Sequence, residues 1–420
     1  MSYKITAENV YKIFGPEPER ALEMSQQGAS KDEVFRETKS VVAVNDISFQ
    51  VPEGQIFVVM GLSGSGKSTL IRCLNRLFEP TDGKIYIDDF DVTAANEEEL
   101  RQVRLKRMSM VFQHFALFPH MTVWENAAYG LKARNVDVEE RRERAVSALK
   151  SVGLDAWADS YPKSLSGGMQ QRVGLARALA VSPEVLLMDE PFSALDPLIR
   201  RDTQDELIEI QERLGSTIVF ITHDLQEALK LGDQIAIMKE GRFVQVGTPQ
   251  QIVMDPADDY VFEFTRDVDR SRVLTFGSIR DEAETLTGDE PVDEIKRRVD
   301  ANAKLKGMFV VDNNKPVGLI DRERIAEAED GATARGLMDR HFAKVRRSTF
   351  ICESFDRLGD HKLFAVVDRE GKLRGTVDPM DVFRHLEPPT EEEAISPGGR
   401  PGEHPDDVEP AAEPVAQETA

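Results

Sequence analysis

The chain has 420 residues, which is too long for a single core and predicts two domains. Its hydrophobic content of 40% is enough to form a core in each. Its formal net charge of −22 at pH 7 argues against sequence-independent nucleic-acid binding, because such binding needs a basic face. No segment approaches the roughly 18 continuous apolar residues of a membrane span, and the N-terminus lacks a signal-peptide core. Cys73 and Cys352 lie far apart without metal-ligand spacing, which suits a reducing compartment and predicts that both are buried or inert.

The first elements in the chain are two strands with an insert between them. Residues 4–12 and 41–51 have strand patterns, and residues 16–39 are predicted to form a helical insert. Ser30 and Glu33 have the spacing of a capping box at the start of a helix within this insert.

The next segments alternate between strand and helix patterns. A short apolar strand at 56–60 runs into a loop of glycine and serine, and a helix begins at Lys67. Helical patterns dominate from about 120 to 180. Residues 185–188 and 217–222 are continuously apolar, as in a parallel sheet buried on both faces. This order predicts an α/β nucleotide-binding core with a helical insertion.

A weak internal repeat follows residue 270. Residues 309–321 parallel residues 365–378, and each copy is strand, turn and strand followed by a helix. The repeat predicts a second, duplicated α+β domain at 271–387. The remaining residues, 388–420, are predicted to be a disordered acidic tail, because the segment is strongly acidic and poor in large apolar side chains.

The loop after the strand at 56–60 matches the phosphate-binding pattern GxxxxGK[ST]. Its glycines let successive backbone N–H groups point inward at phosphates at the start of a helix. Lys67 is expected to bridge the β- and γ-phosphates, and Ser68 to ligate Mg²⁺. The nucleotide-binding candidates in this loop are Gly61, Ser63, Gly64, Ser65, Gly66, Lys67, Ser68 and Thr69.

Two carboxylates follow the apolar strand at 185–188. Asp189 is expected to hold the Mg²⁺ shell, and Glu190 to polarise the attacking water. An apolar strand followed by Asp-Glu is common, so this assignment depends on the phosphate loop upstream. Together the two motifs predict nucleotide hydrolysis assisted by Mg²⁺.

The order of six motifs resembles the ATP-binding cassette (ABC) proteins. Leu165-Ser-Gly-Gly-Met-Gln170 resembles the LSGGQ signature, with Met169 where glutamine is usual. The resemblance implies a P-loop NTPase with a RecA-like core and a helical subdomain at about 120–180. Gln113 resembles the Q-loop residue, Ser193-Ala-Leu-Asp196 the D loop and His223 the switch histidine. The resemblance implies that Glu190, His223 and Gln113 serve catalysis, and that Ser68, Gln113 and Asp189 hold Mg²⁺. It adds Phe14, Ser166, Gly167, Gly168 and Asp196 to the residues that bind ATP.

Phe14 stands where the family places an aromatic ring against adenine, and Tyr11 is a nearby competitor for that role. The resemblance also implies a homodimer, in which Ser166 and Gly168 of one subunit close over the γ-phosphate held by the other. Hydrolysis would then separate the subunits, and a groove near Gln113 would transmit this motion to the membrane partner. We expect domain limits of 1–270 for this ATPase.

Two segments resemble the ATPases of glycine betaine/proline importers. They are the insert at 16–39 and the segment Phe112-Gln-His-Phe-Ala-Leu-Phe-Pro-His-Met-Thr122. Those importers carry a tandem CBS pair, which the C-terminal repeat resembles. The resemblance implies a peripheral protein at the cytoplasmic face of the inner membrane. It implies as partners a transmembrane permease subunit and an extracytoplasmic solute-binding protein, and no nucleic acid.

The CBS pair departs from the usual Gly-x-x-Ser/Thr-x-x-Asp pattern. Asp321 and Asp378 stand at the hydroxyl positions, where a carboxylate would repel an anionic nucleotide. Sensing of ionic strength or of a membrane surface is therefore preferred to nucleotide sensing, and a dimerisation module without ligand stays open. The acidic tail either responds to charge screening or is solvated without a specific role.

Three other functions stay open at this stage. Import of another solute, such as choline, carnitine or another amine, is the nearest, because the ATPase does not contact the cargo. A non-transport ABC ATPase of DNA repair or translation is less consistent with a single cassette that lacks a basic surface. A regulatory module that has lost catalysis conflicts with the presence of Lys67, Asp189, Glu190 and His223.

Overall fold

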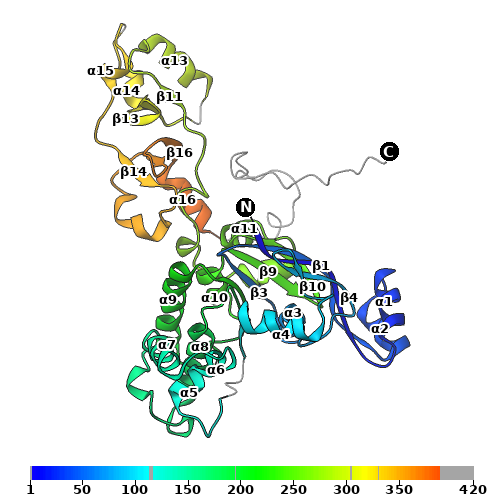
Figure 1. The fold of residues 1–420 in the computed structure, drawn as a ribbon. Coiled ribbons are helices and arrows are strands. Elements are labelled where there is room, and N and C mark those ends of the chain that lie inside the picture. Colours follow the sequence, from blue (N-terminus) through cyan, green and yellow to red (C-terminus); the bar gives the residue numbers. More distant parts are fainter. Residues whose placement is uncertain (1, 113–116, 194, 303–304, 330, 388–420) are drawn as a thin grey trace, which may run out of the picture. The chain divides into compact units, whose positions relative to one another are not determined.

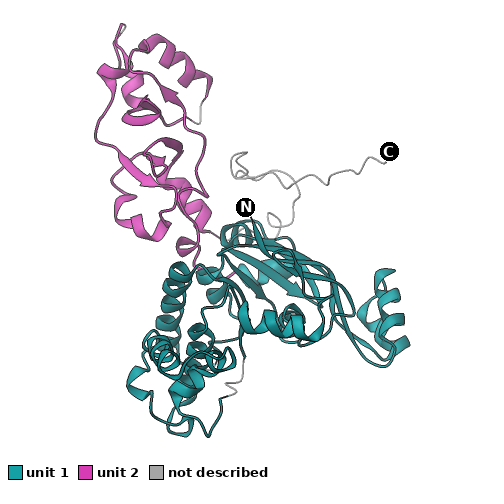
Figure 2. Cartoon of the chain, viewed as in Figure 1, with its two compact units in different colours: residues 1–265 teal, residues 266–420 magenta. Residues whose placement is uncertain are grey.

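The computed structural model describes residues 2–112, 117–193, 195–302, 305–329 and 331–387. The chain divides into two compact units, residues 1–265 and residues 266–420 (Figure 2). The acidic tail at 388–420 lies outside the described residues.

The N-terminal unit contains two sheets. The first is antiparallel, in the order β2-β1-β4-β5. The second has the order β10-β9-β3-β8-β7-β6, in which all neighbours are parallel except the β9–β10 pair at one edge. The first sheet comprises β1 (Tyr3–Phe14), β2 (Val41–Pro52), β4 (Asp82–Ile87) and β5 (Phe90–Asp91). The second comprises β3 (Ile56–Met60), β6 (Met108–Val111), β7 (Val185–Asp189), β8 (Thr217–Thr222), β9 (Gln234–Lys239) and β10 (Arg242–Gly247).

The central strands β3, β7 and β8 are buried along their whole length, as their continuous apolar runs predict. Two cores form on the two faces of the parallel sheet. One contains the inner face of the antiparallel sheet and α3, and the other contains α5 to α8. Helices of this unit are α3 (Lys67–Leu74), α4 (Glu97–Lys106), α5 (Val123–Ala127), α6 (Tyr129–Ala133), α7 (Val138–Lys150), α8 (Gly167–Ala180), α9 (Pro197–Leu214), α10 (Leu225–Leu231), α11 (Pro249–Met254) and α12 (Asp259–Thr265).

The predicted insert forms two helices, α1 (Pro18–Gln26) and α2 (Lys31–Thr38), at one end of the β1–β2 pair (Figure 1). Ser30 and Glu33 make both hydrogen bonds of the predicted capping box. The helices have a small core of their own, formed by Ile13, Ala21, Val34 and Val42.

An ion-pair network joins the two sheets of the N-terminal unit. Lys4 on β1 is buried, and its Nζ lies 2.7 Å from Glu184 and 3.0 Å from Asp88. Arg107, just before β6, contacts the same two carboxylates. Because Glu184 precedes β7 while Lys4 belongs to the antiparallel sheet, the network fixes one sheet against the other.

The C-terminal unit repeats one small fold twice. In each repeat a short strand pairs in parallel with a central strand, which pairs antiparallel with a third. The repeats therefore confirm the predicted duplication. The first contains β11 (Thr285–Leu286), α13 (Val292–Ala301), β12 (Gly307–Asp312), β13 (Lys315–Asp321), α14 (Arg322–Ala326) and α15 (Ala334–Leu337). The second contains β14 (Ala343–Arg346), β15 (Phe364–Val367), β16 (Leu373–Val377) and α16 (Pro379–Leu386).

Among the described residues, none of the helices has the length and apolar character needed to cross a bilayer.

Candidate nucleotide-binding and hydrolysis site

The phosphate-binding loop, residues 61–69, connects the buried strand β3 to the helix α3. Gly66 caps α3 with a φ of 108°, in the left-handed region that favours glycine. A Cβ atom at this position would lie 2.2 Å from the carbonyl oxygen of Ala43. Only glycine therefore lets the loop lie this close to strand β2.

Lys67 is buried and points back into its own loop. Its Nζ donates hydrogen bonds to the carbonyl oxygens of Gly61, at 2.8 Å, and Leu62, at 2.9 Å. Burial lowers the pKa of Lys67, and the carboxylates of Glu190 and Asp189 oppose that shift. The ammonium group thus sits inside the loop, where a phosphate would compete with the two carbonyls for it.

Ser68 and Asp189 form the part of the site that fits a magnesium ion. The Ser68 hydroxyl donates a 2.7 Å hydrogen bond to Oδ1 of Asp189, which is completely buried at the end of β7. Arg72 lies 3.4 Å from the other carboxylate oxygen. One serine hydroxyl and one carboxylate, completed by phosphate oxygens and water, are the oxygen donors that Mg²⁺ takes in nucleotide sites.

Glu190 and His223 face each other across the ends of β7 and β8. Nδ1 of His223 lies 3.0 Å from Oε2 of Glu190. Glu190 has a φ of 49°, which is unusual for a residue with a side chain, and its N–H donates to the Ile221 carbonyl at 3.1 Å. Such backbone strain persists where surrounding contacts enforce it, and it concentrates at functional sites.

The signature residues form the start of α8. Ser166 is the N-cap, and its hydroxyl accepts a hydrogen bond from the N–H of Met169. The Met169 side chain packs against the helical core, and Gln170 donates to the carbonyls of Pro162 and Leu165. The methionine that departs from the usual signature therefore has a packing role, while Ser166 and Gly167 remain exposed and Gly168 is half-buried.

The D-loop residue Asp196 is the N-cap of α9. Its Oδ1 accepts a 3.1 Å hydrogen bond from the N–H of Ile199. Gln113, the predicted Q-loop residue, lies outside the described residues.

Phe14, and not Tyr11, presents its ring at the surface. Tyr11 is 6% exposed and belongs to the core, whereas Phe14 is 39% exposed. The ring of Phe14 meets Phe78 edge-on at 5.4 Å, and the Lys12 ammonium lies 4.9 Å from its centroid. Of the two candidates, Phe14 is therefore the one whose ring is accessible to an adenine.

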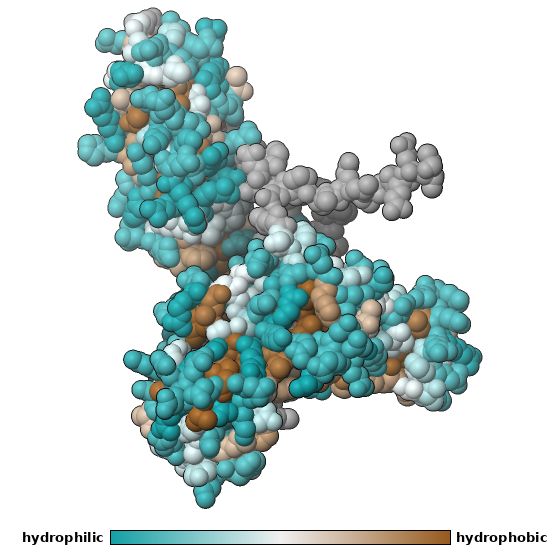
Figure 3. Space-filling view, in the orientation of Figure 1, coloured by the Kyte–Doolittle hydropathy of each residue, from teal (hydrophilic) through white to brown (hydrophobic). Residues whose placement is uncertain are grey.

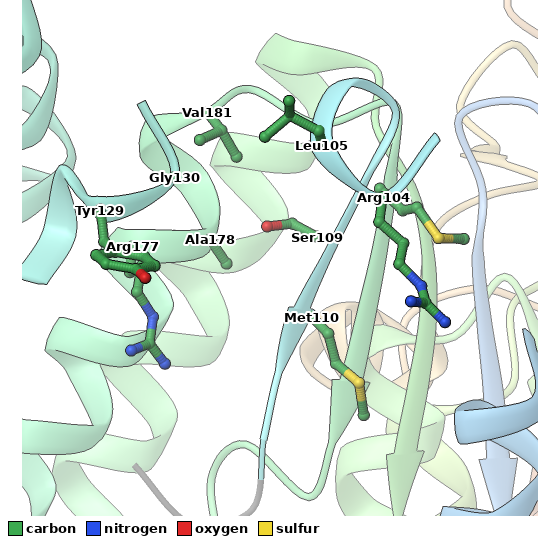
Figure 4. A pocket seen from close by; sticks show the side chains of 10 residues that line it. Arg104, Leu105, Ser109, Met110, Tyr129, Gly130, Arg177, Ala178 and Val181 are labelled. Carbon is green, nitrogen blue, oxygen red and sulfur yellow. The ribbon is translucent and has the colours of Figure 1, made fainter. Parts of the chain in front are cut away.

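A cavity of about 160 Å³ lies between strand β6 and the helices α6 and α8. It is bounded by the end of α4, strand β6, the start of α6 and the last turns of α8. Tyr129 and Arg177 lie on its helical side, opposite Ser109 and Met110 of β6 (Figure 4). The space-filling view shows apolar side chains on the face of the N-terminal unit where α6 and α8 lie (Figure 3).

In the C-terminal unit, two equivalent ion pairs join the repeats. Lys362, just before the central strand β15 of the second repeat, lies 3.2 Å from Asp321 of the first. Lys306, at the equivalent place in the first repeat, contacts Asp378 of the second. Asp321 and Asp378 also cap the helices α14 and α16. The carboxylates at the unusual CBS positions therefore hold helix ends and lysines of the opposite repeat.

Comparison with known proteins decides the family. The model of the ABC transporter family matches residues 44–193. The glycine betaine transport ATP-binding protein OpuAA of Bacillus subtilis is 48% identical over 379 residues, which cover 89% of this chain and 90% of that protein. The chain belongs to the ATP-binding subunits of ABC transporters. It is therefore an ATP hydrolase that serves a transporter.

Other relatives extend over the C-terminal unit of this ABC transporter subunit. The glycine betaine/proline betaine transport system ATP-binding protein ProV of Escherichia coli is 45% identical over 395 residues, covering 92% of this chain and 98% of that protein. The CBS domain family matches residues 276–331, which include most of the first repeat. Among solved structures, the ATP-binding cassette MJ0796, a dimer bound to ADP and Pi, is 32% identical with a TM-score of 0.51. That match covers 58% of this chain and 98% of MJ0796.

Sequence reasoning missed several side chains of the ABC transporter site. Arg72 lies one helical turn after Ser68 on α3 and reaches Asp189. Glu227 lies three residues after Asp224, the cap of α10 next to His223, and Arg200 lies four residues after Asp196, the cap of α9. A signal was present in each case, because residues four apart on a helix, or one turn past a capping residue, share a face with the motif.

Proposed function

We propose that the protein energises the import of glycine betaine or a proline-type compatible solute. The observation that carries this proposal is the similarity to the betaine transport subunits, which extends over about nine tenths of the chain and includes the C-terminal unit. Import of another small amine is the alternative. Relatives named for trimethylamine N-oxide transport, from Pelagibacter ubique and Ruegeria pomeroyi, are 45% identical over 329 and 324 residues.

Each residue of the site has a proposed role in ATP hydrolysis. Lys67 and the N–H groups of residues 61–69 hold the β- and γ-phosphates, with Phe14 against the adenine. Glu190 accepts a proton from the attacking water, and His223 orients that water and the γ-phosphate. Bound Mg²⁺, held by Ser68, Asp189 and Gln113, would neutralise charge on the phosphates.

A homodimer completes the site. Ser166 and Gly167 are exposed at the N-terminus of the 14-residue helix α8, where N–H groups and the helix dipole favour an anion. We propose that Ser166, Gly167, Gly168 and Asp196 of one subunit contact the ATP held by the other. Each of two bound nucleotides is then enclosed by both subunits.

The cavity between β6 and α8 supports docking to a permease. Its wall combines exposed Tyr129 with Met108 and Met110, which suits an amphipathic helix of a membrane protein. Since the cavity lies between the core and α8, a helix seated there would follow the movement of the signature. In this arrangement the protein is peripheral at the cytoplasmic face of the membrane, and a solute-binding protein delivers cargo on the other side.

We further propose that the CBS pair regulates the ATPase according to ionic strength, without an adenosyl ligand. Lys362 and Lys306 already neutralise Asp321 and Asp378 across the repeats, at the positions where the family pattern has hydroxyl groups. Both lysines are more than half exposed, so salt screens these pairs. Nucleotide binding would have to displace both.

Radiolabelled glycine betaine uptake after salt upshock tests the transport proposal. A deletion strain without a redundant betaine transporter is complemented with the wild type or with Glu190→Gln. Uptake restored by the wild type and absent with Glu190→Gln supports the proposal. Uptake unaffected by the deletion removes betaine as the cargo, and competition by carnitine, choline and trimethylamine N-oxide then identifies the amine.

The regulatory proposal is tested with Lys306→Ala and Lys362→Ala together. We expect uptake by this variant to reach its half-maximal rate at a different salt concentration, with an unchanged maximum. Equilibrium dialysis of the full chain with radiolabelled AMP, in competition with unlabelled ATP, should detect no site outside the ATPase. A second AMP site in the wild type would contradict ionic sensing.

A further inference from the structure

A second buried carboxylate lies behind the Glu190–His223 pair. Glu227, on the first turn of α10, is 5% exposed. Its Oε2 accepts a 2.6 Å hydrogen bond from the Thr222 hydroxyl, and its Oε1 accepts a 3.2 Å bond from Nε2 of Gln204. Burial raises the pKa of Glu227, and the Thr222 hydrogen bond opposes that shift.

Glu227 controls the backbone on both sides of His223. The Thr222 hydroxyl that donates to Glu227 also accepts the N–H of Asp224 at 3.0 Å. Asp224 in turn accepts N–H groups of Gln226 and Glu227. His223 is therefore held between two residues whose polar groups close a ring with Glu227.

The same network reaches the D loop through Arg200 on α9. Its Nη1 lies 3.3 Å from Asp224, and its Nε lies 3.8 Å from Glu227. Its Nη2 donates a 3.3 Å hydrogen bond to the carbonyl of Leu195, next to the capping residue Asp196. Arg200 thus connects the start of α9 to both carboxylates beside His223.

A cavity of about 10 Å³, room for a single water, lies among these residues. Glu190 and His223 line it together with Arg200 and Glu227. The catalytic candidates and the network therefore lie next to each other.

We propose that Glu227 is a positioning residue for ATP hydrolysis. Together with Arg200 it fixes the backbone at His223 relative to Leu195 and Asp196 of the D loop. A displacement of the D loop then changes the distance between His223 and Glu190. This inference rests on the roles proposed above for His223, Glu190 and Asp196.

The test measures steady-state ATP hydrolysis by the full chain. Glu227→Gln and Arg200→Ala are each made in the wild type and in His223→Ala, after thermal unfolding shows that the variants fold. Glu206→Gln, which changes a partly buried carboxylate on α9 outside this network, is the matched control and should leave kcat and KM unchanged. If Glu227→Gln does not fold, Arg200→Ala in the wild type is compared with Arg200→Ala in His223→Ala, and this comparison is sufficient for the test.

We expect Glu227→Gln to lower kcat about tenfold, with KM for ATP within twofold of the wild type. In the His223→Ala background the same change should cost less than twofold further, because its effect passes through His223. Equal fold losses in both backgrounds would overturn the proposal, as would wild-type kcat in Glu227→Gln. Full activity of His223→Ala itself would instead contradict the role proposed for His223, and the positioning role would fall with it.

Discussion

Ser68 donates a 2.7 Å hydrogen bond to Asp189 although 121 positions separate them in the chain. Helix α3 begins beside the end of β7 because β3, β8 and β7 are neighbours in one parallel sheet. The carboxyl ends of parallel strands meet at one edge, where α/β proteins bind ligands. Ser68 and Asp189, two of the three metal-binding candidates, thus come together without a ligand.

Removal of Mg²⁺ should abolish hydrolysis but leave nucleotide binding largely intact. In the proposed site Lys67 and the loop N–H groups contact phosphate directly, whereas Ser68 and Asp189 hold the ion. Ser68→Ala should raise the Mg²⁺ concentration needed for half-maximal ATPase activity by about tenfold or more. Titration of activity with Mg²⁺ at saturating ATP measures this shift. An unchanged Mg²⁺ requirement would contradict the assignment of Ser68.

Glu190→Gln should bind ATP and lower kcat at least about 100-fold, because the amide cannot accept the proton of the attacking water. With hydrolysis blocked, the variant should accumulate as an ATP-bound dimer. Size-exclusion chromatography with ATP and Mg²⁺ tests this, with ADP as the control in which the variant stays monomeric. Rapid turnover by the variant would refute Glu190 as the base.

Gly66→Ala should abolish ATP binding, because its Cβ would lie 2.2 Å from the Ala43 carbonyl and its φ is 108°. Fluorescent ATP titration measures the loss. Gly359→Ala is the matched control, because a Cβ there has no atom within 4 Å. Equal affinities of the two variants would show that the loop tolerates the side chain.

The network that joins the two sheets should make stability depend on pH. Burial tends to raise the pKa of Glu184, but hydrogen bonds from Lys4 and Arg107 outweigh burial and lower it from its ordinary value of 4.5. A lowered acidic pKa stabilises the fold above pH 4.5, and this contribution disappears as the pH falls through the folded-state pKa.

Glu184→Gln should therefore lower the free energy of unfolding at pH 7 by about 0.5–1 kcal/mol, a modest effect because Glu184 is nearly half exposed. The difference should shrink below pH 4. Tryptophan fluorescence in urea reports on this unit, since Trp124 and Trp157 both belong to it. Glu143→Gln, on the exposed face of α7, is the control. If the difference in the free energy of unfolding did not change with pH, the Glu184→Gln effect would come from packing and not from charge.

The two thiols should react at very different rates. Burial raises the pKa of Cys73 to about 12, so at pH 8 only about one molecule in ten thousand carries its thiolate. Cys352 is half-buried. Labelling of the folded chain with a chromogenic disulfide should show one accessible thiol, and Cys352→Ser should show none until urea is added. Fast labelling of Cys352→Ser would contradict the burial of Cys73.

The family and the order of its motifs follow from the sequence alone, because each motif is a run of adjacent residues. The phosphate loop must combine glycine at strained angles with Lys67 and Ser68 at the start of a helix, and local sequence records this. The capping box at Ser30 and the duplicated C-terminal fold are also local or repeated patterns. These were predicted and confirmed.

The tertiary structure alone decided which distant groups meet. Strand alternation places Tyr11 and Phe14 on opposite faces of β1, but only the packing of the other elements decides which face is covered, and it buries Tyr11 and leaves Phe14 exposed. The reciprocal Lys–Asp pairs of the CBS repeats and the link from Glu227 to Leu195 depend on how separate helices and strands pack. Local patterns fix where a side chain points on its own element, while packing between elements fixes what it touches.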